Sequence, residues 1–139
     1  MAAGEMVLYY TPENKKEAAK LKGILVQMGV RIKMITQEQV QQKVGFLAGV
    51  EGFTEQPGAA ADGAEEMDRE IMVMKNFTGQ RMSELFSRMR RAGLGRMDYK
   101  AVLTEQNVNW TFLELYREIK REHEAMHAGQ KGEGNGQER

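Results

Sequence analysis

The stretch Asp98–Ile119 constrains this chain most, because it predicts a strand, a turn and a helix in direct succession. It reads DYKAVLTEQNVNWTFLELYREI. The run Tyr99–Leu103 has the composition of a short β-strand, and the polar residues 104–109 separate it from an amphipathic helix. That helix carries the only tryptophan of the chain, Trp110. A lone strand needs neighbouring strands, and an apolar helix face needs a surface to cover, so the rest of the chain must supply a sheet.

The composition limits the class of protein that can result. The chain has 139 residues, enough for one domain with its own core. It contains no cysteine, so we expect no disulfide, no thiolate nucleophile and no cysteine-ligated metal. The first residues, MAAGEMVLYY, lack the basic region of a signal peptide, and no apolar run reaches the roughly 20 residues of a membrane helix. We therefore expect a soluble, cytoplasmic protein that does not contact a membrane.

Four apolar runs predict the strands of the sheet. Met6–Tyr10 and Ile71–Met74 are apolar throughout, which is typical of strands buried on both faces. Val30–Ile35 and Tyr99–Leu103 include Lys or Arg, which favours the edges of the sheet. The pattern predicts an α/β fold with a small, four-stranded, mostly parallel sheet in the order 2-1-3-4 and helices on both faces. The alternative is two βαβα halves that pack less regularly or are completed by a second chain.

A helix is expected after each strand. Thr11 and Thr78 suit the N-caps of the first and third helices. The second helix is predicted to run from Thr36 to about Ala48, because apolar side chains recur there with helical spacing.

The two halves of the chain resemble each other, and an acidic segment joins them. Lys33–Thr36 parallels Lys100–Thr104 with one residue of slip. Residues 49–68 are rich in glycine, alanine and acidic side chains, which predicts a flexible acidic connector. The predicted organisation is a single α/β domain over 1–128, with halves 1–48 and 69–128, and a disordered tail over 129–139.

Ligands of open parallel α/β sheets bind outside the carboxyl ends of the strands, at the point where the connections diverge. In the predicted order that point lies between the first and third strands, and the turns after all four strands would share one rim. Their polar and aromatic side chains are candidates for binding a small ligand or an anion: Tyr10, Thr11, Asn76, Thr78, Thr104, Asn107 and Trp110. Helix capping is the alternative interpretation of several of them. The chain has no glycine-rich phosphate loop.

One motif near the end of the chain resembles a metalloprotease site. His123-Glu124-Ala125-Met126-His127 matches HExxH, in which two imidazoles one helical turn apart bind zinc. A catalytic zinc needs a third protein ligand, and the chain has no further histidine and no cysteine. We therefore predict no metal site, no cofactor and no catalytic residue, which argues against an enzyme.

The partners that the sequence suggests are proteins rather than nucleic acids. The arginines of the second half raise RNA as a partner: Arg81, Arg88, Arg90, Arg91 and Arg96. Arg88, Arg90 and Arg91 are explained more simply as the solvated side of a helix, since a nucleic-acid surface usually adds aromatic side chains or a larger charge excess. The last helix, in contrast, is apolar around more than one side. Core packing is the first interpretation of this apolar surface. The alternative is that the surplus forms a homodimer face or binds another protein.

The segment Lys100–Thr104, with Asn107, Trp110-Thr111 and Leu113-Glu114-Leu115, resembles a bacterial family known as domain of unknown function 3783. The likeness covers about residues 71–122. It implies a small, bacterial, cytoplasmic α/β protein, and it transfers no activity and no catalytic residue. The sequence as a whole predicts a non-catalytic binding or regulatory module. The alternatives are a small-molecule or nucleotide-binding domain that uses the carboxyl-end rim, or an RNA-associated protein.

Overall fold

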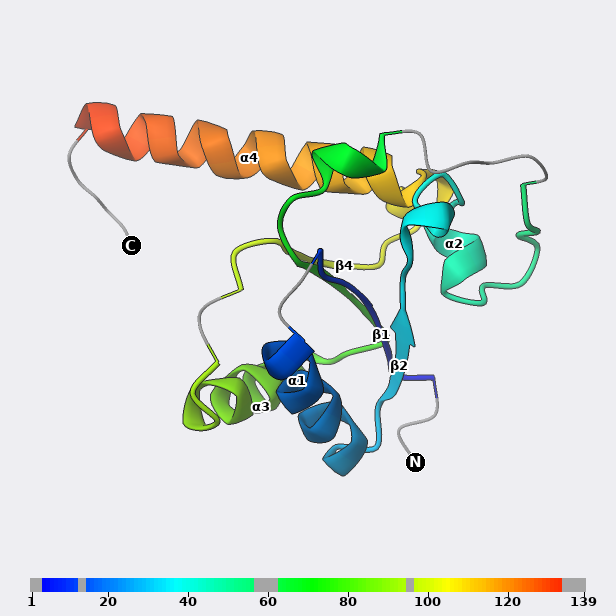
Figure 1. Ribbon diagram of the computed structural model, residues 1–139, viewed down its shortest axis with the longest axis horizontal. Helices are drawn as coiled ribbons and strands as arrows, with labels where there is room; N and C mark the ends of the chain where they lie inside the picture. Colours follow the sequence, from blue (N-terminus) through cyan, green and yellow to red (C-terminus); the bar gives the residue numbers. More distant parts are fainter. Residues whose placement is uncertain (1–3, 13–14, 57–62, 95–96, 134–139) are drawn as a thin grey trace.

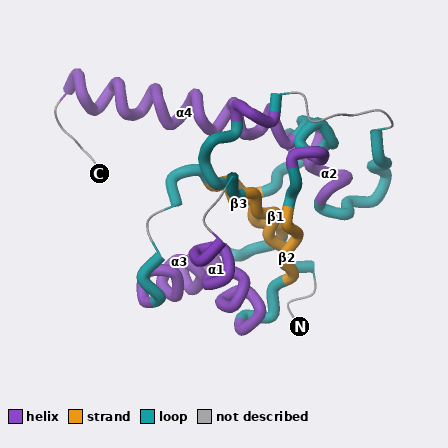
Figure 2. Tube along the Cα trace, in the orientation of Figure 1, coloured by secondary structure: helices purple, strands orange, loops and turns teal. Residues whose placement is uncertain are grey.

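A computed structural model describes residues 4–12, 15–56, 63–94 and 97–133. Within them a four-stranded sheet lies between two groups of helices (Figure 1). Helices α1 and α3 cover one face, and α2 and α4 lie over the other (Figure 2). The elements in chain order are β1 (Met6–Tyr10), α1 (Lys15–Gln27), β2 (Arg31–Met34), the 3-10 helix η1 (Gln37–Gln39), α2 (Val44–Leu47), the 3-10 helix η2 (Ala64–Glu66), β3 (Ile71–Lys75), α3 (Gly79–Arg91), β4 (Lys100–Val102), the 3-10 helix η3 (Asn107–Asn109) and α4 (Phe112–Glu133).

The strand order β2-β1-β3-β4 confirms the predicted order and places the strands that carry Lys or Arg at the edges. The pairs β1–β2 and β3–β4 are parallel, so the sheet is mostly parallel, as predicted. The central pair is antiparallel, with Leu8 opposite Val73. The expectation of one common rim was therefore wrong, because the carboxyl ends of β1 and β2 lie at the opposite end of the sheet from those of β3 and β4. The crossover rule fixes the relative direction of two strands only within one βαβ unit. The long connection from β2 to β3 therefore allows the second pair of strands to run opposite to the first.

Each face of the sheet has its own buried cluster, because successive side chains of a strand point to opposite faces. Val7 of β1 lies on the face covered by α1 and α3, where it is buried with Leu85. Leu8 lies on the other face and is buried with Phe112 and Tyr116 of α4. The prediction that the central strands are buried on both faces is thus confirmed.

The segment after β2 differs from the single helix that was predicted from Thr36 to about Ala48. It forms η1, an irregular stretch and the short helix α2. The backbone N–H of Val44 donates to the carbonyl of Trp110 at 2.8 Å, and the N–H of Phe112 donates to the carbonyl of Gln42 at 3.0 Å. These bonds to the other half of the chain take the place of helical bonds. Helical spacing did not reveal them, because tertiary contacts override local preference.

The two halves share more than their strand pattern. The backbone N–H of Thr36 donates to the side chain three residues further on, at 2.9 Å, and that of Thr104 does the same at 2.8 Å. Lys43 and Thr111, each seven residues after its threonine, form an antiparallel bridge with each other. The antiparallel centre of the sheet and this bridge relate the halves by an approximate two-fold axis.

The connector predicted over 49–68 is described on both sides of residues 57–62. On the first side, the side-chain amide of Gln42 binds both backbone groups of Gln56, at 2.8 and 3.2 Å. On the second side, Ala64 and Met67 are buried beneath α4. The described parts of the connector therefore pack on the domain, and the division of the chain into halves stays a prediction.

Helix α4 is described to Glu133 and so includes the beginning of the tail predicted over 129–139. Residues 134–139 lie outside the described part of the chain. In that described part, no helix is long and apolar enough to cross a membrane.

Candidate functional site

The structure distributes the seven side chains that the sequence singles out over three places. Two of them lie at and directly after the last residue of β1, at one end of the sheet, and four follow β3 and β4, at the opposite end. The last lies at the start of α4 and packs partly against the cluster on that face. Tyr10 and Thr11 are the pair at β1, and Trp110 is the one at the start of α4. The four that follow β3 and β4 are Asn76, Thr78, Thr104 and Asn107. The antiparallel centre of the sheet is the reason for this separation.

Several of these side chains make bonds that shape the fold. The hydroxyl of Thr78 accepts from the backbone N–H of Arg81 at 3.1 Å and caps α3, as predicted. Asn76 has a left-handed backbone, with φ of 63°, and its Nδ2 donates to the carbonyl of Gly4 at 3.0 Å. These contacts fit the capping and turn interpretation, and ligand binding by these residues stays a prediction.

Thr104 and Asn107 stabilise the turn between β4 and α4. The side chain of Asn107 accepts from the N–H of Thr104 and donates to the carbonyl of Val102 at 3.1 Å, while its own N–H donates to the Thr104 hydroxyl at 3.0 Å. Asn107 is only 7% exposed. Its polar atoms are therefore engaged in holding the approach to α4.

The tyrosines of the chain gather around residues 67–70, which lead into β3. Tyr9 donates to Glu70 at 2.6 Å, Tyr10 to the carbonyl of Met67 at 3.3 Å, and Tyr116 to Asp68 at 2.9 Å. The Arg69 guanidinium lies 4.7 Å from the ring centroid of Tyr99. The four tyrosine side chains thus contact the four consecutive residues 67–70, one each.

This tyrosine cluster is suited to holding a segment rather than to proton transfer. Burial first, and then the bond to Glu70, raises the pKa of Tyr9 well above its ordinary value. Burial and the bond to Asp68 do the same to the pKa of Tyr116. Neither phenol therefore ionises near neutral pH. The cavity beside Tyr9 and Glu70 has a volume of about 10 Å³, room for about one water molecule.

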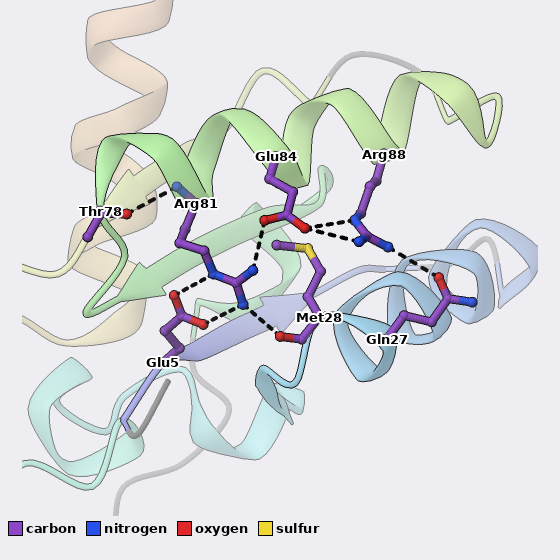
Figure 3. A network of polar contacts seen from close by, with 7 residues as sticks. All are labelled: Glu5, Gln27, Met28, Thr78, Arg81, Glu84 and Arg88. Atoms are coloured by element: carbon purple, nitrogen blue, oxygen red, sulfur yellow. Dashed lines mark hydrogen bonds and ion pairs between the residues drawn. The ribbon is translucent and has the colours of Figure 1, made fainter. Parts of the chain in front are cut away.

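A second polar cluster joins β1, α1 and α3 (Figure 3). Arg81 donates to both carboxylate oxygens of Glu5, at 2.8 and 3.0 Å, and to the carbonyl of Met28 at 2.6 Å. Glu84 accepts from Arg81 at 2.8 Å and from Arg88 at 3.0 Å. Glu5 is 6% exposed, so its burial requires this paired, two-bond partner. The cluster ties two helices to the start of the central strand.

The cluster predicts a pH dependence of stability. Arg81, and then Arg88, hold the pKa of the Glu84 carboxyl below its ordinary value. Such a carboxyl stabilises the fold above its unfolded-state pKa of about 4.3, and the contribution is lost as the pH falls through the lower, folded-state pKa. We expect Glu84→Gln to lower the midpoint of thermal unfolding at about pH 7 and to have less effect at about pH 3.

Circular dichroism melting curves at both pH values measure this effect. The matched control is Glu38→Gln, which changes an exposed carboxylate of η1. An equal loss for Glu84→Gln at both pH values would contradict the expected role of its charge.

The outward side of α4 carries an open groove of about 330 Å³. An α-helix turns by about 100° per residue. Glu114 and Glu118 each stand two residues beyond a buried aromatic side chain of α4, so they point away from the sheet. The side chains that line the groove are Trp110, Glu114, Arg117, Glu118 and Arg121.

The groove is held in place by bonds at the start of α4. The N–H of Thr111 donates to the Glu114 carboxylate at 2.8 Å, and the N–H of Glu114 donates to the Thr111 hydroxyl at 3.0 Å. This reciprocal pair is a capping box. Arg117 makes two bonds of 2.8 Å to Glu66 of η2. The half-buried Trp110 therefore sits on a fixed backbone beside four charged side chains, and we define these five residues as the α4 groove.

Trp110 was predicted as a site residue from the sequence, whereas the four charged members of the α4 groove were not. A signal was present, because residues 114, 117, 118 and 121 repeat with helical spacing and out of phase with the apolar stripe of the same helix.

Among the described side chains, no group of three His, Cys, Asp or Glu could hold a metal ion. The His123 ring lies edge-on to Tyr99, with the ring centroids 5.4 Å apart. The side chain of His127 lies outside the described residues.

The architecture defines a small α/β protein with a four-stranded mixed sheet between helices. Residues 70–126 match the model of a family described as Domain of unknown function (DUF3783). The stretch from β3 into α4 therefore carries this domain, and the resemblance inferred from the sequence over about residues 71–122 is confirmed. The match includes the whole α4 groove. No curated protein and no solved structure matches the chain.

Proposed function

We propose that this protein is a non-catalytic module that binds a protein partner through the α4 groove. The observation that carries the proposal is the open groove of about 330 Å³ beside Trp110 on a capped helix. Tryptophan and arginine are the residue types that most often dominate the energy of protein interfaces. A location in the bacterial cytoplasm is part of the same proposal, and it is what the family resemblance implies.

The state of the buried polar groups supports a binding role over a catalytic one. The phenols of Tyr9 and Tyr116 have raised pKa values and are bonded to carboxylates. Arg81 is fully engaged by Glu5, Glu84 and a backbone carbonyl. Groups that are paired in this way stabilise the fold and are not poised as an acid, a base or a nucleophile.

The two alternatives have less support. A small-molecule site on the carboxyl-end rim would need side chains that the antiparallel centre places at opposite ends of the sheet. Of the arginines that could form an RNA surface on α3, Arg81 and Arg88 are bound to carboxylates, which leaves Arg90 and Arg91 exposed. Two exposed arginines are a weak footprint for nucleic acid.

Photo-cross-linking tests the proposed binding surface. The full chain, with Glu118 replaced by p-benzoylphenylalanine, is expressed in cells of its source organism and irradiated. We expect a covalent adduct, because residue 118 lines the α4 groove. The matched control places the same amino acid at Lys22, which is exposed on α1 across the sheet. An adduct at 118 and none at 22 supports the proposal, whereas the absence of any adduct at 118 overturns it.

A further inference from the structure

We infer that the partner of the α4 groove is a second copy of this chain, whose α4 lies antiparallel to the first across a two-fold axis. This inference rests on the proposed function, because it uses the same surface. It goes further by stating which partner the groove fits and which residues face each other.

The order of charges along α4 carries the inference. The outward side of the helix presents, in turn, Glu114, Arg117, Glu118 and Arg121. When two such helices run antiparallel, with the axis between residues 117 and 118, Glu114 faces Arg121 of the second copy and Arg117 faces its Glu118. Each contact occurs twice, so all charges of the two grooves meet opposite charges. A two-fold interface requires such a self-complementary patch, and charge complementarity of this kind fixes partner and register.

The size of the side chains agrees with the same register. Trp110 lies as far from the axis on one side as Ala125 lies on the other. In the antiparallel pair the large indole therefore faces the exposed, small side chain of Ala125 of the second copy. Pairing a large with a small side chain lets the two helices approach closely.

The surroundings of α4 leave room for this arrangement. The groove lies on the side of α4 opposite its buried face, and the later turns of the helix extend beyond the rest of the described fold (Figure 1). A second α4 laid on the outward side therefore meets this helix and, beside Arg117, the 3-10 helix η2 that carries Glu66.

The ion pairs present in the single chain do not prevent the association. Arg121 pairs with Glu118 of the same helix, and Arg117 pairs with Glu66. The side chains of Arg117 and Glu66 are 48% and 45% exposed. Exposed pairs of this kind contribute little to stability, so they exchange readily for contacts with a second copy. The resulting dimer is reversible and depends on concentration.

Two charge reversals test the register. Glu118→Arg places arginine against Arg117 of the second copy twice, and Arg117→Glu places glutamate against Glu118 twice. We expect the unaltered chain to have the mass of a dimer at high concentration, and each variant alone to have the mass of a monomer. Mixing the two variants in equal amounts should restore the dimer, because every contact in the mixed pair is again between opposite charges. Glu114 is left unchanged because it caps α4.

Sedimentation equilibrium measures these masses, and Trp110 reports association independently. Its emission should shift to shorter wavelength when the dimer forms, since it is the only tryptophan of the chain. Circular dichroism confirms that each variant is folded. A monomeric unaltered chain overturns the inference, as do single variants that remain dimeric or a mixture that stays monomeric.

The cross-linking experiment separates failure of this inference from failure of the proposed function. An adduct at residue 118 with the mass of two chains supports the second copy. An adduct of another mass supports the binding module but overturns the second copy, and the absence of an adduct overturns both.

Discussion

Replacing Phe112 with alanine should lower the free energy of unfolding by about 3–5 kcal/mol. Phe112 is 0% exposed and lies in the first turn of α4, where it is buried with Leu8 and Tyr116. The loss has two parts: the apolar surface of the ring is no longer removed from water, and a cavity remains because the surrounding strands and helix relax only partly. The anchoring of the α4 groove to the sheet depends on this ring.

Urea unfolding followed by circular dichroism measures the effect of Phe112→Ala. Glu124→Ala is the control on the same helix, because Glu124 is exposed, and we expect a change within about 0.5 kcal/mol. Typical domains have total stabilities of about 5–15 kcal/mol, so the Phe112 variant should still fold. A loss below about 1 kcal/mol would mean that the ring is not a main contact of α4 with the sheet.

The strand order was predictable because burial leaves a clear trace in the sequence. Met6–Tyr10 and Ile71–Met74 have no charged residue, and they make up the two central strands except for the half-buried Lys75 that ends β3. Arg31 and Lys100 mark the two edge strands. A charged side chain is costly inside a sheet that is covered on both faces, so the position of each strand can be read from its own residues.

The direction of the central pair was not predictable in the same way. Burial reports how deep a strand lies and says nothing about which way it runs. The crossover within each βαβ unit constrains only β1 with β2 and β3 with β4. The antiparallel contact of Leu8 with Val73 joins residues from different units. The split of the candidate site into opposite ends of the sheet follows from this one contact.

The candidate site was only partly predictable. Trp110 drew attention because it is the only tryptophan. Glu114, Arg117, Glu118 and Arg121 did not, because charges on a helix usually form a solvated face. What distinguishes them is their position beside Trp110 in one groove, together with an order of charges that is complementary to itself when reversed. This self-complementary order of charges can be read from the sequence once the buried side of α4 is known.

The second large effect is expected at Gly63, where Gly63→Ala should lower the free energy of unfolding by about 2–5 kcal/mol. Gly63 has φ of 87°, a left-handed conformation that costs other residues about 1–2 kcal/mol. A Cβ at this position would also lie 2.5 Å from a methyl carbon of Leu113, and relieving such a clash costs about 1–3 kcal/mol in a packed core. The backbone strain and the clash with Leu113 both arise from this single substitution, so their costs add.

Gly29→Ala separates these contributions, because Gly29 has a similar φ of 76° but no neighbour within 4 Å of the added carbon. It should cost only the backbone strain, about 1–2 kcal/mol. Urea unfolding of both variants gives the cost of the Leu113 contact as their difference. This contact sets how closely the connector crosses the first turn of α4, and Glu66, which binds Arg117 of the groove, follows three residues later. Equal losses for the two variants would show that Leu113 moves aside freely and that the connector does not fix the position of the groove.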